Sequence, residues 1–572
     1  MARPTLIQRM LAGLVALMGI TNISSALLVH QIIRNRVLHT LLPIEVISAG
    51  RSLTMIAGFS LLIVAWGLMR GKRVAWMLTL GLLGASALLH MIKGLDWEEA
   101  LGAIALGGVL LVQRRHFVCR SDPPTLRRAP LFLAGGVVAI VVYGLVGFWL
   151  LRAFQPVTLS LALQELAAQM LWSDGPYAPF VHGRAAWFLD SLSLLSLTLV
   201  SGTLLLLLRP VLPHSTSACD RARADALLRR YATSSLAPFA RESDKLLYFG
   251  ETVEGVVVYR VAGRGAVVCG DPIAAPEHVG KLAQEFMHFC ARQDWLVCFY
   301  EVQPRHLPDY TPLGFEVVKI GEDAWIELSK FTLKGSAIAD VRHAVSNIVR
   351  DGLTFHRFDP RQDSGVWAQV QAIESAWRAA QGGIELRFSI GRLPDQPDPN
   401  ARYTLALAAD GATVLAYCSF LPIEGIDGLA VDVMRRAPGA PNGTMEFLLA
   451  RSLEYLRETG IAWVALGLAP LANVDTPRDS LLERGIRAIY SSPKINAAYH
   501  FQSLFFFKCK FNPQWRGGYL LYPNVLALPA VLAAVVRVHV PILGARLVLN
   551  ALREKLVVRQ TASTAVAAVK AR

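Results

Sequence analysis

The chain has 572 residues, 53% of them hydrophobic, and a mean hydropathy of +0.40. These values exclude an ordinary soluble enzyme of this length and a single-domain protein. The net charge of +14 favours anionic partners such as nucleic acid or anionic lipid. The seven cysteines include no CxxC pair, so we expect free thiols in a reducing compartment rather than a zinc site or disulfides.

Apolar runs dominate residues 1–212 and predict an α-helical membrane domain. A helix needs roughly 20 apolar residues to cross the bilayer core. The segment around Glu165 is expected to form an amphipathic helix in the membrane interface. We predict about six spans, the fourth being the shortest, at 9–30, 53–70, 75–94, 98–113, 131–153 and 186–208.

Basic loops set the predicted orientation of these spans. "RGKR" (70–73) and the loop 113–128 are rich in Lys and Arg, whereas "GLDWEEA" (94–100) is acidic. Because basic loops stay in the cytoplasm, both termini and everything after residue 212 are expected there. His90 and Lys93 are interpreted as interfacial residues at the edges of spans.

From about residue 215 the charged residues become regular and β-like runs appear. Two mixed α/β units of similar type are predicted, at 215–330 and 336–520. In the second unit a strand, a loop rich in Pro and Gly and a helix follow one another from Val431 to Glu458. This arrangement resembles the GNAT acyltransferase fold, in which such a loop binds the CoA pyrophosphate at the start of a helix.

Two segments partly fit the GNAT pattern (Q/R)-x-x-G-x-(G/A). "RVAGRG", which starts at Arg260, fits it literally, but it lies between two predicted strands, where a hairpin explains its glycines. In the second unit Arg436 and Gly439 fit, but Pro441 replaces the last small residue and removes a backbone donor. The loop therefore suggests a phosphate loop adapted to a ligand other than CoA.

Nine short motifs carry a resemblance to a known family. They are "CGDPIA" (269–274), "CFYEV" (298–302), "LGFEVVKIGEDAWIEL" (313–328), "FTLKG" (331–335), "IELRFSIGR" (384–392), "VDVMRR" (431–436), "GTMEFLL" (443–449), "LGLAPLANV" (466–474) and "FFKCKFNPQW" (506–515). In order and spacing they resemble the bacterial aminoacyl-phosphatidylglycerol synthases, the multiple peptide resistance factor family of phosphatidylglycerol lysyl- and alanyltransferases. The resemblance covers nearly all of 240–522. It implies two tandem GNAT-like units, with the transfer site in the second and without the family's flippase half.

The resemblance also implies an activity. An aminoacyl group would move from aminoacyl-tRNA to the glycerol hydroxyl of phosphatidylglycerol in the bacterial cytoplasmic (inner) membrane, giving resistance to cationic antimicrobial peptides. The donor and the product are both esters, so no cofactor and no metal is expected. The expected partners are aminoacyl-tRNA, phosphatidylglycerol and other anionic lipids; a homo-oligomer and a separate flippase are compatible with this interpretation. The transferred residue stays open between Lys, Ala and Arg.

Four residues are candidates for the chemistry. Asp432 or Glu446 would bind the α-ammonium group of the donor, Arg435 a phosphate, and Lys508 the oxyanion or a phosphate. Structural alternatives are a favourable charge at a helix N-terminus for Glu446 and a salt bridge between Asp432 and Arg435. The predicted substrate-binding residues are Glu385, Arg387, Ser389, Arg436, Asn473 and Tyr499.

The segment 523–560 is apolar with basic residues and predicts an amphipathic helix in the membrane interface, with a seventh span as the alternative. Two other functions stay open. One is a membrane-tethered acyl-CoA-dependent N-acyltransferase, and the other is a non-enzymatic lipid transporter or sensor.

Overall fold

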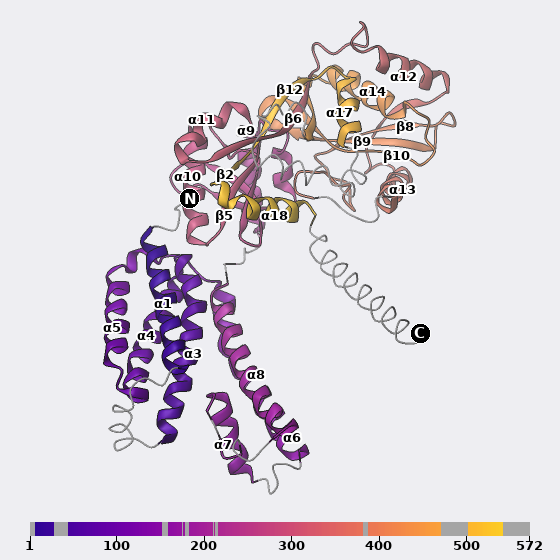
Figure 1. Ribbon diagram of the computed structural model, residues 1–572. Helices are drawn as coiled ribbons and strands as arrows, with labels where there is room; N and C mark the ends of the chain where they lie inside the picture. Colours follow the sequence, from indigo (N-terminus) through magenta and orange to yellow (C-terminus); the bar gives the residue numbers. More distant parts are fainter. Residues whose placement is uncertain are drawn as a thin grey trace, which may run out of the picture. The chain divides into compact units, whose positions relative to one another are not determined.

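The computed structural model describes residues 6–27, 44–151, 158–173, 175–177, 182–209, 211, 216–380, 387–470 and 501–540. The chain divides into two compact units, a helical one (residues 2–212 with 291–295) and an α/β one (213–290 with 296–572). Figure 1 shows the helical unit in indigo to magenta and the α/β unit in magenta to yellow. An α-helical membrane-type region followed by an α/β region was predicted, and this fold class is confirmed.

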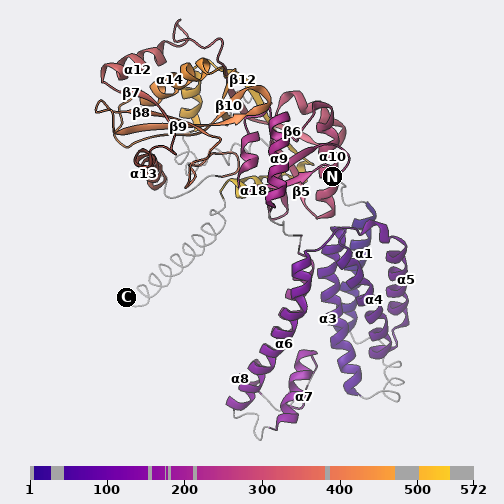
Figure 2. The ribbon, with the colours of Figure 1, turned by 180° about the vertical axis from the view of Figure 1, so that it is seen from behind.

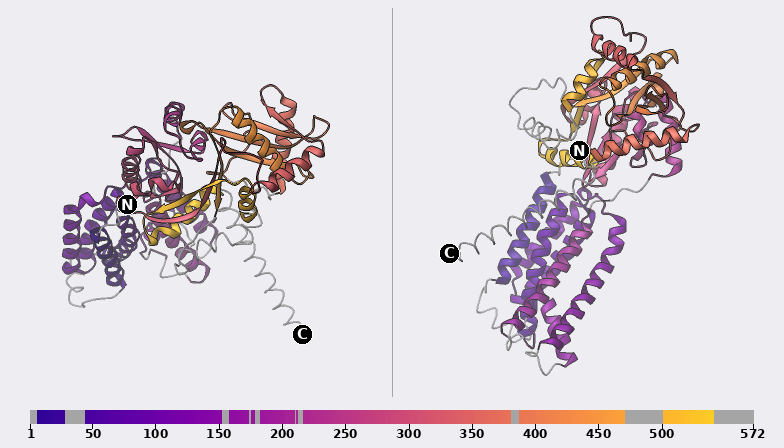
Figure 3. Two further views of the ribbon diagram at one scale, coloured as in Figure 1. Left: turned by 90° about the horizontal axis from the view of Figure 1, so that it is seen from above. Right: turned by 90° about the vertical axis from the view of Figure 1, so that its right-hand side faces the viewer.

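The helices of the helical unit run alongside one another (Figure 3, right). They are α1 (Leu6–Leu27), α3 (Ile44–Met69), α4 (Arg73–Gly94), α5 (Trp97–Val112), α6 (Pro123–Leu150), α7 (Leu159–Met170) and α8 (Arg184–Leu207). Five of the described helices are long and apolar enough to cross a membrane. The fourth predicted span coincides with α5, but 16 residues rise only about 24 Å, less than the ~30 Å hydrocarbon core. The described residues thus hold five such helices where six spans were predicted.

Polar side chains that were placed at the membrane interface are buried inside the helical unit. His90 and Lys93 are 0% and 3% exposed, and the Nε2 atom of His90 lies 2.9 Å from Oδ1 of Asn22. Glu165 on α7 is also fully buried and accepts a hydrogen bond of 2.8 Å from Gln169. These three side chains therefore have protein partners: Asn22 of α1 for His90, Asp96 for Lys93, and Gln169 of the same helix for Glu165. Their position at a membrane interface stays a prediction.

One twelve-stranded sheet runs through the α/β unit, in the order β1-β2-β3-β5-β12-β6-β11-β10-β9-β8-β7, with β4 paired to β2. Among the described strands, the pairs β3–β5 and β10–β11 are parallel and the others antiparallel. The strands are β1 (Leu246–Phe249), β2 (Gly255–Ala262), β3 (Gly265–Cys269), β4 (Ile273–Ala274), β5 (Leu296–Val302), β6 (Glu316–Glu327), β7 (Thr354–Phe358), β8 (Arg402–Leu407), β9 (Val414–Ile423), β10 (Gly428–Arg436), β11 (Trp463–Pro470) and β12 (Gln514–Tyr522).

Each half of the sheet contains one parallel strand pair joined through a helix. The helix is α10 (Val279–Arg292) between β3 and β5, and α14 (Thr444–Glu458) between β10 and β11. This repetition agrees with two units of similar type. The strands of the two predicted units, 215–330 and 336–520, nevertheless form one continuous sheet, because β12 lies between β5 and β6.

Helices cover both faces of the sheet (Figures 1 and 2). In the second half, α12 and α14 share a core with one face, and α13 packs on the opposite face. In the first half, α9 and the C-terminal helix α18 share the core of one face. The remaining α helices of this unit are α9 (Ala218–Tyr231), α11 (Leu307–Tyr310), α12 (Ala339–Arg350), α13 (Ser364–Ala380), α17 (Phe501–Cys509) and α18 (Leu528–His539).

The C-terminal helix α18 belongs to the soluble core. Val531, Ala534 and Val538 are buried, and the helix packs against β2 and β3. The described part of the predicted interfacial segment 523–560 therefore covers the sheet instead, and residues 541–560 lie outside the described residues. The apolar face of an amphipathic helix can pack against a sheet or against lipid. The apolar periodicity of the sequence therefore did not distinguish a helix that covers the sheet from one in the membrane interface.

Candidate functional site

A β-bulge positions Asp432 at the centre of the sheet's second half. Val431 pairs with Phe420 and Met434 with Cys418, so Asp432 and Val433 together face Ser419. The Ser419 hydroxyl donates to Oδ2 of Asp432 and accepts from the Val433 amide, both at 3.0 Å. A bulge leaves one residue unpaired and redirects its side chain, which is a common device beside active sites.

The carboxyl group of Asp432 is poised to titrate near neutrality. Its pKa is raised to about 7, first by burial and then by the nearby carboxylates of Glu242 and Asp398, while the Ser419 hydrogen bond and the Arg435 charge act in the opposite direction. A perturbed carboxyl group in a cavity marks a functional candidate.

Arg435 is held rigidly by an aromatic ring and an acidic partner. Its guanidinium carbon lies 3.6 Å from the ring centre of Trp377, and its Nε lies 3.6 Å from Oε2 of Glu374. The Tyr417 hydroxyl donates to the same Glu374 oxygen at 2.6 Å. The predicted alternative of a salt bridge between Asp432 and Arg435 is thus replaced by the ion pair with Glu374. Burial lowers the pKa of Arg435.

A large cavity, here called the basic cavity, has a volume of about 1050 Å³ and begins beside Arg435. Glu446 lies on its wall, in the first turn of α14, and its Oε1 pairs with the Lys510 Nζ at 2.8 Å. The cavity also has an apolar lining that includes Trp377, Met434 and Phe506. Its cationic lining residues are Arg378, Arg392, Arg435, Arg436 and Lys510, against the carboxylates Glu374 and Glu446.

A smaller cavity of about 250 Å³, here called the inner cavity, adjoins the basic cavity. Six lining residues are common to the two cavities: Ile390, Gly391, Met434, Arg435, Leu504 and Phe507. Asp432 and Lys508 both line the inner cavity. Three of the four predicted catalytic residues therefore converge on it, and the fourth, Glu446, lines only the basic cavity.

Lys508 is buried at the end of α17. Its Nζ donates to the carbonyl oxygens of Gly467 at 2.8 Å and Leu468 at 2.9 Å. Burial lowers its pKa to about 8, while the charges of Asp323 and Glu301 act in the opposite direction. An ammonium group has three donors, so one N–H is left for a ligand in the inner cavity.

The sequence interpretation missed the acidic partners of Lys508. Asp323 on β6 accepts from the Ser235 hydroxyl at 2.6 Å and from the Trp325 indole at 2.7 Å. Glu301 lies near the end of β5. Both residues were inside motifs that carried the resemblance, "CFYEV" and "LGFEVVKIGEDAWIEL". For Glu301 the available signal was a single carboxylate in the otherwise apolar strand β5, whereas β6 holds several charged residues and gave no such signal for Asp323.

A third cavity of about 380 Å³, here called the rear cavity, is lined by both Asp323 and Glu301. Arg516 lines it and stacks on Trp325, with 4.1 Å from the guanidinium carbon to the ring centre. Ser235 and Glu301 are the lining residues shared by the rear and inner cavities.

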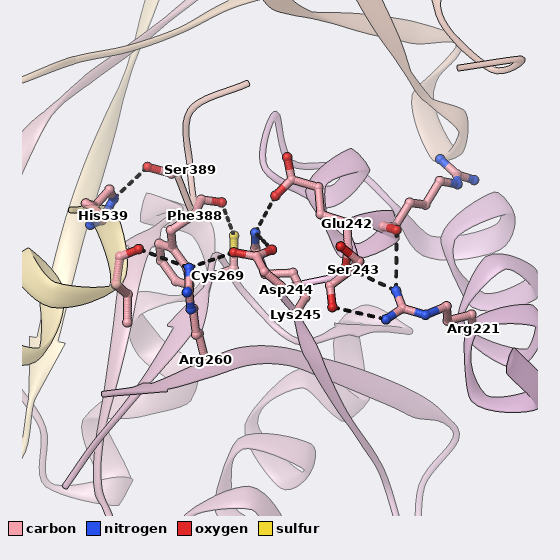
Figure 4. A network of polar contacts seen from close by, with 12 residues as sticks. Arg221, Glu242, Ser243, Asp244, Lys245, Arg260, Cys269, Phe388, Ser389 and His539 are labelled. Carbon is pink, nitrogen blue, oxygen red and sulfur yellow. Dashed lines mark hydrogen bonds and ion pairs between the residues drawn. The ribbon is translucent and has the colours of Figure 1, made fainter. Parts of the chain in front are cut away.

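Ser389 reaches the inner cavity from a loop that α18 fixes. Its Oγ lies 2.8 Å from Nε2 of His539, and the Arg387 amide donates to the His539 carbonyl at 2.9 Å. Figure 4 shows this pair beside a buried cluster in which Lys245 donates to Oε2 of Glu242 at 2.6 Å. In the same view Arg260 of the β2–β3 hairpin pairs with Asp244, which lies just before β1, at 2.7 Å. Arg260 thus has a structural partner.

The remaining predicted binding residues are only partly placed. Arg436 is exposed and lines the basic cavity. Glu385, Asn473 and Tyr499 lie outside the described residues. A group of residues with metal-ligand geometry that the described ranges contain, His90 with Asp96 and Glu99, lies in the helical unit, where the Lys93 ammonium pairs with Asp96 at 3.1 Å.

Comparisons with known proteins show which family the α/β unit matches. The family described as "Phosphatidylglycerol lysyltransferase, C-terminal" matches residues 225–522. Phosphatidylglycerol lysyltransferase of Bacillus subtilis is 28% identical over 318 residues, covering 56% of this chain and 37% of that protein. Lysylphosphatidylglycerol biosynthesis bifunctional protein LysX of Mycobacterium avium is 25% identical over 498 residues, covering 83% of this chain and 41% of that protein.

A solved structure shows the same fold. The structure of L-PGS from Bacillus licheniformis is 25% identical, with a TM-score of 0.51, and covers 57% of this chain and 98% of that one. This chain spans only about two fifths of the length of the two curated relatives above.

Proposed function

Because this chain belongs to the phosphatidylglycerol lysyltransferase family, we propose that it is a membrane aminoacyltransferase that forms lysyl-phosphatidylglycerol. The observation that carries the proposal is the convergence of Asp432, Arg435 and Lys508 on one inner cavity that adjoins a large basic cavity. The donor is lysyl-tRNA, and the acceptor is the glycerol hydroxyl of phosphatidylglycerol.

The basic cavity suits both substrates. Phosphatidylglycerol and the 3′ end of tRNA each carry phosphate, and five cationic side chains line this cavity. Arg435 is the best placed of them, because Trp377 and Glu374 fix its guanidinium plane. Its Nη1 donates to the Met434 carbonyl at 2.9 Å, which leaves Nη2 without a hydrogen bond among the described residues and able to bind a phosphate. The apolar part of the lining accommodates the glycerol and the first acyl carbons of the lipid.

The inner cavity supplies the groups that the transfer needs. The ester carbonyl of the donor becomes an oxyanion when the lipid hydroxyl attacks it, and the third N–H of Lys508 stabilises that charge. The ionised carboxylate of Asp432 binds the α-ammonium group of the donor. The donor is already an activated ester, and the acceptor is a hydroxyl group. The transfer therefore requires alignment of the two groups and proton transfer, and no organic cofactor.

The apolar helices support a location in the membrane that holds the acceptor lipid. We place the protein in the bacterial inner membrane with the α/β unit in the cytoplasm, where aminoacyl-tRNA is made. The product carries more positive charge than phosphatidylglycerol and lowers the attraction of cationic peptides to the membrane. A separate flippase would carry the product to the outer leaflet.

The alternative of an acyl-CoA donor has little support from the loop before α14. Pro441 offers no backbone N–H, and the carboxylate of Glu446 lies in the first turn of the helix, where a pyrophosphate would need donors.

The test uses the purified full-length chain in vesicles of phosphatidylglycerol and a neutral lipid. With lysyl-tRNA we expect lysyl-phosphatidylglycerol by mass spectrometry, and ribonuclease treatment of the donor abolishes it. Alanyl- and arginyl-tRNA are compared in parallel. Product formed from an acyl-CoA alone, or no product with any of the three aminoacyl-tRNAs, contradicts the proposal.

A further inference from the structure

Glu301 occupies the wall between two cavities. It lines both the inner cavity, beside Asp432 and Lys508, and the rear cavity, beside Arg516. The residue is only 5% exposed, although its side chain is ionisable. Acidic residues are almost never buried to this degree without a partner, so the position calls for a physical explanation.

The backbone at Glu301 is also unusual. Its φ angle is +63°, in the left-handed region that is unfavourable for a residue with a Cβ. The strain coincides with an irregularity in the pairing of β5 with β12, where Tyr519 faces Val302 and Leu521 faces Phe299. Strain of this kind persists when the surrounding structure enforces it, and it gathers at functional sites.

The polar neighbours of Glu301 leave its carboxylate available. Asp323 accepts two hydrogen bonds, whereas Glu301 makes no hydrogen bond and no ion pair within the part of the chain that the structure describes. Burial raises the pKa of Glu301 well above its usual range, and the Asp323 charge raises it further, while the Lys508 charge lowers it. A carboxylate without hydrogen-bond partners among the described residues, on the wall of the inner cavity, is free to accept a proton from a ligand there, and its burial makes it a stronger base than an exposed carboxylate.

We propose that Glu301 is a catalytic residue of the transfer reaction, the general base that takes the proton of the attacking lipid hydroxyl. This inference rests on the proposed function. The hydroxyl oxygen forms a bond to the ester carbonyl carbon, and its proton passes to the Glu301 carboxylate. When the tetrahedral intermediate collapses, the bond from that carbon to the tRNA ribose oxygen breaks, and Glu301 returns the proton to this oxygen. Between these two steps, the Lys508 ammonium group stabilises the oxyanion of the tetrahedral intermediate.

The test compares three substitutions in the full-length chain with lysyl-tRNA and phosphatidylglycerol vesicles. Glu301→Gln keeps the shape and removes the base, so kcat should fall about 10²–10⁴-fold while the KM for lysyl-tRNA stays within a factor of three. Glu301→Asp should retain part of the rate. Glu277→Gln, at an exposed position, is the control and should match the parent chain.

Glu301→Gly separates chemistry from structure. Glycine adopts the positive φ without strain, so its thermal midpoint should equal or exceed that of the parent chain, although its activity is lost. The vacated space admits formate, which should restore part of kcat in Glu301→Gly and none in Glu301→Gln. Full activity of Glu301→Gln, or a loss in Glu301→Gly that formate does not relieve, would overturn the role. If the parent chain itself makes no product, the proposed function fails instead.

Discussion

Gly391 lies directly against Asp432, so that a Cβ at position 391 would overlap the Oδ1 atom of that carboxylate. The contact joins the loop after Ser389 to the bulge of β10 and closes one side of the inner cavity. Glycine is required here for close approach rather than for its φ angle, since the neighbouring atoms leave no space for a side chain.

Gly391→Ala should therefore displace the Asp432 carboxylate. We expect kcat/KM for lysyl-tRNA to fall at least about 10²-fold, since a shift of about 1 Å in a positioned group has effects of this size. Steady-state kinetics with phosphatidylglycerol vesicles measure it. Gly365→Ala, on α13 with only an ordinary contact at 3.4 Å, is the matched control. If Gly391→Ala leaves the kinetics unchanged, the aminoacyl donor does not bind at Asp432 in the inner cavity.

Asp432→Asn should abolish activity and yet stabilise the protein at alkaline pH. The folded pKa of about 7 exceeds the ordinary value of 3.8, so the folded state binds the proton more tightly, and stability falls as pH rises between these values. The neutral amide escapes this loss. We expect the thermal midpoint of the variant to exceed that of the parent chain by several degrees at pH 8 and to equal it near pH 4. A variant that is less stable at pH 8 would contradict the buried-carboxylate account.

Arg435→Lys tests whether the guanidinium plane matters or only its charge. Lysine keeps the charge but loses the stacking on Trp377 and the paired donors, so the KM for phosphatidylglycerol should rise about 10-fold or more. Arg436→Ala, at the exposed neighbour, should change it less than about threefold. Equal effects of the two substitutions would show that the cavity senses net charge alone.

Lys508→Met should reduce both the rate and the stability. Methionine leaves the carbonyl groups of Gly467 and Leu468 without their donor and Asp323 with less compensating charge. We expect a loss of about 2–4 kcal/mol in the free energy of unfolding, and kcat lower by about 10²–10³ in the protein that remains folded. Denaturant unfolding and single-turnover transfer measure the two quantities. Retention of the rate would remove Lys508 from the oxyanion site.

Cys219 offers a direct test of orientation, because it is an exposed thiol at the start of α9. An impermeant maleimide should not label it in intact cells and should label it after permeabilisation. Glu98→Cys, in the first turn of α5 and within the acidic segment 94–100 that is predicted to lie outside, is the positive control. Cys418 is unsuitable because it is buried on either side of the membrane. Labelling of Cys219 in intact cells would contradict the cytoplasmic placement.

Local patterns predicted local structure well. The helix expected over 444–458 is α14, Thr444–Glu458, and "RVAGRG" forms the β2–β3 hairpin with Gly263 at a φ angle of +62°. Asp432 and Arg435 lie close together along the chain, near the end of β10, so their position at one site could be predicted from the sequence. The bulge that aims Asp432 was not predictable, because it depends on the register of β9 against β10.

Long-range relationships had no counterpart in the sequence pattern. Glu301, Asp323 and Lys508 are brought together by three elements that are remote along the chain, and nothing local to "CFYEV" specifies β12 as its neighbour. The partner of Arg435 was missed for the same reason. Glu374 belongs to α13, and the strands β8 and β9 separate α13 from β10 along the chain. Burial of His90 likewise depends on Asn22 of another helix.

The position of β12 sets the order in which this protein is completed during synthesis. Trp515 and Leu521 pair with residues of β6, and β12 also pairs with β5, so the centre of the sheet is filled by one of the last described strands. Until the ribosome releases about residue 522, β5 and β6 are open edges that can pair with other chains. A nascent chain arrested before this point would hold its membrane helices in the bilayer while its α/β unit depended on chaperones. Slow codons or stalling upstream of β12 should accordingly cause aggregation, and the same events after Tyr522 should not.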